Sequence, residues 1–190
     1  MKNKNKPPRE ITYADDDQLP LSKLAFLRFP PLIIGLFLGL LLSFAVSRFE
    51  QVLSNNVEVA FFIPFIVYMA AAVGNQTQVI FIRDLSAGTA KFSVYLIKET
   101  SLGIILGLLF GAISWLAVIL WFKASSLALT VSLSMFATVA IAPLNAILIA
   151  KAFQLDRRDP ALGAGPIGTI IQDAVSIIFY GLIASAILLG

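Results

Sequence analysis

Four long uncharged runs constrain this chain more than any other feature of its sequence. They cover residues 29–47, 59–82, 100–122 and 124–150. At a rise of about 1.5 Å per residue, each run is long enough for an α-helix to cross the roughly 30 Å hydrocarbon layer of a bilayer. The runs are apolar on all sides and far longer than the roughly ten-residue alternating strands of a membrane β-barrel, so they predict helices.

A fifth apolar segment, residues 160–190, holds a single charged residue, Asp173. We interpret it as a fifth membrane-spanning helix that carries a carboxylate inside the membrane. The predicted fold is an all-α integral membrane protein with five transmembrane helices. Residues 29–190 form the transmembrane domain, and residues 1–28 form a cytoplasmic tail that we expect to be disordered, because its many polar residues leave no long apolar stretch before Phe29.

The charges between the predicted spans indicate the orientation. With the N-terminus in the cytoplasm, all of the 14 Lys and Arg residues except Arg48 and Lys123 lie on the cytoplasmic side. Cytoplasmic loops of membrane proteins carry an excess of Lys and Arg. We therefore expect a multi-pass protein of the plasma membrane with a cytoplasmic N-terminus and an external C-terminus. The same distribution accounts for the net charge of +3 without a nucleic-acid partner.

Small residues and prolines inside the runs predict how the helices pack. Glycines at four-residue spacing occur in the first span, as Gly35 and Gly39, and in the third span, as Gly103, Gly107 and Gly111. Such spacing lets two helix backbones approach closely, so we expect a packing face on each span. Pro64 and Pro143 lie inside the second and fourth runs, where proline removes a backbone hydrogen bond and kinks the helix.

Asp173 is the most informative polar residue inside the predicted spans. If the fifth helix begins near Pro166, the carboxylate lies about 10 Å below the cytoplasmic end, too deep for a short side chain to reach water. Thr169, Asp173, Ser176 and Tyr180 then share one face of the helix. The other uncharged runs contain no Lys or Arg that could pair with Asp173. We interpret Asp173 as a cation or proton site; a protonated carboxyl bonded to a neighbour is the alternative.

The available ligand chemistry narrows the choice of cation. The chain has no Cys and no His, so only oxygen ligands remain, which suit hard ions such as magnesium. One carboxylate per chain favours a largely hydrated cation or a site completed by a second subunit. In the second span, residues 74–78 read Gly-Asn-Gln-Thr-Gln. These polar residues either line a polar path or reach toward the cytoplasmic interface.

Residues 159–173 carry a specific resemblance. They read DPALGAGPIGTIIQD, which is similar to the Asp-Pro-Ala, Gly-Pro, Thr and Asp pattern in the membrane domain of the MgtE family of magnesium transporters. Further similar segments are Pro64 with Gly74-Asn75-Gln76 and Ile82-Arg83, Lys98-Glu99 with Gly103, and Pro143-Leu144. Two segments depart from the pattern: Ala70-Ala71-Ala72 stands where the family has Gly-Gly-Asn, and Asp84 stands where it has glycine.

The resemblance implies a homodimer with an ion path near the two-fold axis, between the second and fifth helices. Asp173 would be the central ligand of Mg²⁺, the transported ion. The other residues expected to line the path are Thr169, Ser176, Gly74, Asn75, Gln76, Gln78, Pro64 and Asn145. The resemblance covers residues 29–190, so we expect a transport domain without the family's cytosolic regulatory domains.

The expected function is channel-like divalent cation transport driven by the membrane potential, and the chain is not expected to be an enzyme. One alternative is an exchanger that couples the divalent cation to sodium or protons. Another is a membrane enzyme or a subunit of a larger complex. Metal-dependent lipid transferases generally cluster several acidic residues, whereas the predicted spans contain one, so the transport interpretation is preferred.

Overall fold

The computed structural model describes residues 18–155 and 160–190, apart from the side chains of residues 154–164. The described part consists of helices joined by short turns and contains no strand. Its helices are α1 (Leu21–Ser47), α2 (Glu50–Asn55), α3 (Val57–Ser86), α4 (Phe92–Phe122), α5 (Ser125–Leu155) and α6 (Pro160–Leu188). All except the short α2 are long and apolar enough to cross a membrane, which confirms the five predicted spans.

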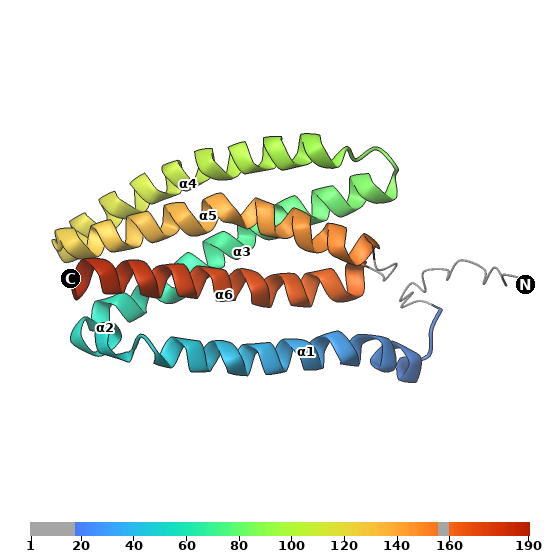
Figure 1. The fold of residues 1–190 in the computed structure, drawn as a ribbon, viewed down its shortest axis with the longest axis horizontal. Coiled ribbons are helices and arrows are strands. Elements are labelled where there is room, and N and C mark those ends of the chain that lie inside the picture. Colours follow the sequence, from blue (N-terminus) through green and yellow to red (C-terminus); the bar gives the residue numbers. More distant parts are fainter. Residues whose placement is uncertain (1–17, 156–159) are drawn as a thin grey trace, which may run out of the picture.

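The five long helices run up and down beside one another (Figure 1). α4 packs on α5, α5 packs on α3 and α6, and α1 packs on α6 at the opposite flank (Figure 1). The start of α1, the α3–α4 corner and the start of α6 lie at one end of the bundle (Figure 1). The C-terminus, α2 and the α4–α5 corner lie at the other end.

This arrangement places most of the described Lys and Arg residues at one end of the bundle. The end that holds the start of α1 carries Lys23, Arg28, Arg83, Lys91, Lys98 and Lys151, whereas the opposite end carries Arg48 and Lys123. The described Lys and Arg residues predicted to share one side of the membrane therefore do lie at the same end of the bundle. Which side faces the cytoplasm remains a prediction from this charge difference.

The helix ends differ from the ends of the uncharged runs. α1 begins at Leu21, so residues 21–28 are helical and not part of a disordered tail; residues 1–17 lie outside the described part. α6 begins at Pro160 and not near Pro166, and proline is well tolerated in the first turn of a helix. An uncharged run marks only the hydrocarbon-crossing part, whereas the helix continues beyond it with polar residues. The short α2 was not predicted.

The glycine face of α4 packs directly on the backbone of α5, as predicted. A Cβ atom added to Gly103 or Gly107 would lie 2.8 Å from the carbonyl oxygen of Ala140 or Phe136, respectively. A Cβ atom on Gly111 would lie 3.0 Å from the carbonyl oxygen of Ser132. We call this contact the glycine seam. It places α4 against α5 at a separation that only glycine permits.

The glycines of α1 do not form the predicted packing face. Gly35 has no other atom within 4 Å of an added Cβ, and Gly39 has only the side chain of Ile170, at 3.7 Å. No residue of α1 is buried. The prediction is wrong for a single copy of the chain, because α1 packs mainly on α6 without bringing its glycines into close contact with another backbone.

An apolar core joins α3, α5 and α6 in the half of the bundle near the C-terminus. Buried members include Val59, Phe62 and Ile66 of α3 and Met135 of α5. Tyr180 of α6 is also buried, and its hydroxyl donates a hydrogen bond of 2.7 Å to the carbonyl oxygen of Val59. The face of α6 that carries Tyr180 is therefore closed against α3 in this half of the bundle.

Candidate cation site

Asp173 lies well inside α6, with its side chain partly exposed. At 1.5 Å per residue it lies about 20 Å along the helix from Pro160, farther from the helix start than a start near Pro166 predicted. No hydrogen bond or ion pair joins its carboxylate to any side chain in the part of the chain that the structure describes. A carboxylate in an apolar span without such a partner can accept a ligand.

The polar residues predicted to share a face with Asp173 divide between two environments. Thr169 is exposed, and its hydroxyl donates to the carbonyl oxygen of Gly165 at 3.0 Å. Ser176 and Tyr180 are buried. The polar stripe is therefore open only in the half of α6 that holds Thr169 and Asp173, because the remaining half packs against α3 and α5.

A polar cluster inside the protein joins α5 to α6. The side-chain amide of Asn145 donates to Oε1 of Gln172 at 3.0 Å. Nε2 of Gln172 donates to Oγ of Ser176 at 3.3 Å, and that hydroxyl donates to the carbonyl oxygen of Gln172 at 2.8 Å. Asn145 and Ser176, both expected along the path, therefore bond to a buried glutamine that the sequence analysis missed. Its one signal was an amide beside Asp173 in an otherwise apolar run.

The polar segment of α3, residues 74–78, divides in the same way. Gly74 is buried against Ala142 of α5, and Thr77 and Gln78 are buried as well. Asn75 and Gln76 are exposed. Neither interpretation of this segment holds for all its members, since two side chains point into the protein and two point away from it.

Thr77 and Gln78 each contact a neighbouring helix. The hydroxyl of Thr77 donates to the carboxylate of Glu99 on α4 at 2.7 Å. Glu99 is partly buried. Oε1 of Gln78 lies 3.0 Å from the Cβ that Gly168 of α6 lacks, so glycine at this position lets α3 and α6 approach.

The two prolines differ in exposure. Pro64 of α3 is exposed, so it lies on the outer surface of this chain. Pro143 of α5 is buried, with its Cγ atom 3.0 Å from the Cβ position of Gly103 in the glycine seam. Pro143 therefore belongs to the packing between α4 and α5 and lines no open space there.

Asp84, which departs from the family pattern, has a local role. Its carboxylate accepts hydrogen bonds from Nε of Arg83, at 2.9 Å, and from the hydroxyl of Tyr95 on α4. Its backbone carbonyl accepts the hydroxyl of Thr89 at 3.1 Å. These contacts tie the end of α3 to the start of α4, so this carboxylate holds the corner between the two helices.

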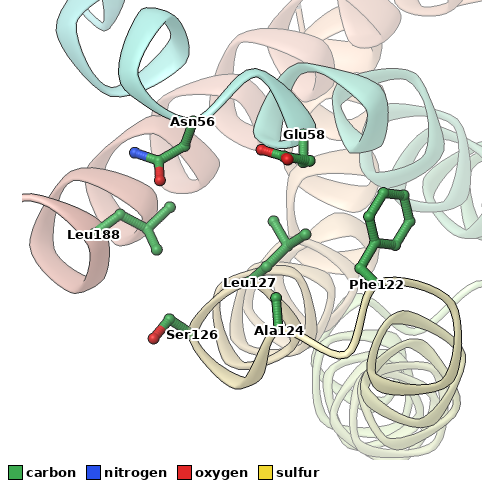
Figure 2. Close-up of a pocket in the computed structure, with 7 residues that line it drawn as sticks. All are labelled: Asn56, Glu58, Phe122, Ala124, Ser126, Leu127 and Leu188. Carbon is green, nitrogen blue, oxygen red and sulfur yellow. The ribbon is translucent and has the colours of Figure 1, made fainter.

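A second polar feature lies at the far end of the bundle. A depression of about 190 Å³ is lined by Asn56, Glu58, Phe122, Ala124, Ser126, Leu127 and Leu188. Figure 2 shows the Glu58 carboxylate beside this opening, with Leu127 and Leu188 below and to one side. Leu188 lies about 22 Å along α6 from Asp173, so the depression and the Asp173 carboxylate are separate places on the molecule.

Comparisons with known proteins agree on one family. Residues 63–183, which include most of α3, all of α4 and α5, most of α6 and Asp173, match the MgtE family, described as a divalent cation transporter. The magnesium transporter MgtE of Bacillus subtilis is 32% identical over 165 residues, covering 85% of this chain and 37% of the relative. The magnesium transporter MgtE of Enterococcus faecalis is 29% identical over 166 residues, covering 86% and 37%.

The chain therefore spans about 37% of the length of these two curated relatives. The family match covers most of the predicted transmembrane domain, and the structure supplies five helices able to cross a bilayer. These findings show that the chain is a multi-pass membrane protein that belongs to the MgtE family of divalent cation transporters.

Proposed function

We propose that this chain carries divalent cations, Mg²⁺ above all, across the membrane along a path lined by α3 and α6. Asp173 is the cation ligand in this proposal. The observation that carries it is a partly exposed carboxylate inside an apolar span, without a hydrogen-bonded or ionic partner in the described residues. Ionisable groups inside membranes are costly and usually serve ion pathways. The two relatives reported above are both named magnesium transporters.

The ligand chemistry supports a hydrated ion. The chain has no Cys or His, and no group of three acidic residues in the described part could hold a metal ion. A single carboxylate cannot supply the six oxygen ligands of a dehydrated Mg²⁺. Mg²⁺ sheds its water reluctantly, so Asp173 would hold the ion partly through its hydration shell.

A homodimer would complete the path. Asn75 and Gln76 of α3, with Thr169 and Asp173 of α6, leave polar side chains exposed on two helices that pack together. Polar groups at membrane depth avoid lipid by facing protein or water. A second copy facing these groups across a two-fold axis would enclose a polar passage and bring two Asp173 carboxylates to one ion.

The membrane potential suffices to drive entry. With the N-terminus in the cytoplasm, inward movement of a dication gains roughly 4.6 kcal/mol at 100 mV, twice the gain of about 2.3 kcal/mol for a single charge. Passage through a channel-like path then needs no further energy source.

The test is the variant Asp173→Ala in cells that lack their own magnesium uptake systems. We expect the parent chain to restore growth at low magnesium and Asp173→Ala to fail, with both proteins present in equal amounts in the membrane. Glu58→Gln is the matched control, because it removes an exposed carboxylate from the separate depression at the far end (Figure 2). Growth rescue by Asp173→Ala equal to the parent would refute the assignment of the ligand.

Flux into proteoliposomes separates a channel from an exchanger. A potential-driven channel carries Mg²⁺ without a sodium or proton gradient, whereas an exchanger requires one of them. Flux that stops when both gradients are removed, at constant potential, would refute the channel mechanism. The same assay with Ca²⁺ and Mn²⁺ measures the ion preference.

A further inference from the structure

The polar cluster of Asn145, Gln172 and Ser176 between α5 and α6 lies next to Asp173. Its α6 member Gln172 points in a different direction from Asp173. Gln172 and Asp173 are consecutive residues, so their side chains leave α6 in directions about 100° apart. Gln172 is only 5% exposed and faces α5, whereas Asp173 is partly exposed. The direction of one side chain therefore determines the direction of the other.

We propose that the hydrogen bond between Asn145 and Gln172 sets the rotation of α6 and thereby aims Asp173 at the cation path. Asn145 and Gln172 are positioning residues in this proposal, which rests on the proposed role of Asp173. Ser176 completes the arrangement, since it accepts from the amide of Gln172 and donates to its backbone carbonyl.

Among the described residues, the opposite side of α6 shows no interhelical side-chain hydrogen bond of this kind. There α6 and α1 border an apolar cavity of about 230 Å³, lined by Leu38, Leu41, Leu42, Ala45, Ile170, Ile171, Ala174 and Ile178. Apolar contacts are non-directional, and lipid competes with them because its chains are equally apolar. Packing on α1 therefore does not hold α6 at one rotation.

Directional contacts fix α6 at two levels. Near the C-terminal end, the hydroxyl of Tyr180 bonds the backbone of Val59. At the level of Asp173, the described side-chain hydrogen bond between α6 and another helix is the one from Asn145 to Gln172. Turning α6 away from this position would leave a nearly buried amide without its partner, which opposes the motion.

The absence of cysteine from the chain allows a direct measurement of this rotation. Thr169→Cys introduces a single thiol on the exposed side of α6, and its reaction rate with a water-soluble methanethiosulfonate reports access from the aqueous path. In that background we expect Gln172→Leu and Asn145→Leu to change the rate by about threefold or more, as expected for losing one interhelical hydrogen bond in a membrane.

Transport gives the second readout. Gln172→Leu and Asn145→Leu should raise the half-saturating Mg²⁺ concentration by about threefold to fifteenfold and lower the maximal flux less. The double variant should be no worse than the worse single variant, because both remove the same bond. The exchanged pair Asn145→Gln with Gln172→Asn keeps the combined length of the two amides and should recover most of the affinity.

Thr138→Val is the matched control on α5. Thr138 is also buried, but its hydroxyl bonds within its own helix, to the carbonyl oxygen of Ser134 at 2.8 Å. Its loss should leave both the thiol reaction rate and the half-saturating concentration unchanged. A shift equal to that of Gln172→Leu would refute the inference, because any buried polar change on α5 would then have the same effect.

Unchanged reaction rate and unchanged half-saturation in Gln172→Leu, with normal amounts of folded protein, would also refute it. If that variant does not fold, Asn145→Leu decides, since it leaves the Gln172–Ser176 contacts in place. The proposed function fails separately: normal transport by Asp173→Ala removes the role of the carboxylate, whereas the thiol reaction rate still measures the rotation of α6.

Discussion

The glycine seam between α4 and α5 contrasts with the contact between α1 and α6. Both α4 and α1 carry glycines at four-residue spacing. In the seam, Gly107 faces a backbone carbonyl of α5 that an added Cβ would meet at 2.8 Å, whereas Gly35 of α1 faces open space. The same sequence pattern therefore accompanies a close backbone approach in one helix and open space beside the glycine in the other. Small residues permit close packing, but a neighbouring helix must be present to use it.

The difference matters because α6 lies between these two kinds of contact. On one side it bonds α5, which the seam holds against α4; on the other side it meets α1 across an apolar cavity. Asp173 thus belongs to a helix with one firmly positioned neighbour and one loosely packed neighbour. The three substitutions below test this contrast.

Gly107→Ala should have the largest effect. The new methyl group would lie 2.8 Å from the carbonyl oxygen of Phe136, and a helix backbone cannot yield without moving α4 as a whole. We expect a loss of about 1–3 kcal/mol in the free energy of unfolding. The measurement is the midpoint temperature for loss of the folded peak in size-exclusion chromatography of detergent-solubilised protein. A midpoint equal to that of the parent would contradict the tight seam.

Thr77→Val should have an intermediate effect. It tests whether the glycine seam alone holds α4 in place. The substitution keeps the shape of the side chain but removes the hydrogen bond to Glu99, one of the contacts that tie α3 to α4. We expect a loss of about 0.5–1.5 kcal/mol, the range of interhelical hydrogen bonds in membranes. The same thermal assay measures it. Glu99→Gln keeps an acceptor for Thr77 and serves as the control, so a larger loss in the control would contradict the role of this bond.

Gly35→Ala should have the smallest effect. An added methyl group meets nothing within 4 Å, and alanine favours helix over glycine by about 1 kcal/mol. We expect an unchanged or slightly higher midpoint temperature in the same assay. A clear loss of stability would show that another surface covers Gly35 in the membrane, and it would restore the predicted packing face of α1.

The most informative residues of the sequence were those whose side chains are costly to place in a membrane. Asp173 stood out because a charge in an apolar span is costly whatever the fold. The Gly103–Gly107–Gly111 face was predictable too. The buried position of Gln172, the partly buried position of Glu99 and the short helix α2 were not predictable. An amide next to a carboxylate is not distinctive in a sequence, and a charged residue near a helix end is usually interpreted as interfacial.

By itself, the sequence determined the five spans, the separation of loop charges and the position of one carboxylate inside the last span. Length, apolar content and charge decide these features, and all three are local properties of the chain. Only the tertiary structure decided that Thr77 and Gln172 point inward while Gln76 and Asp173 do not. Helical periodicity states which residues share a face, but when every face is apolar, the position of the neighbouring helices decides which face meets protein.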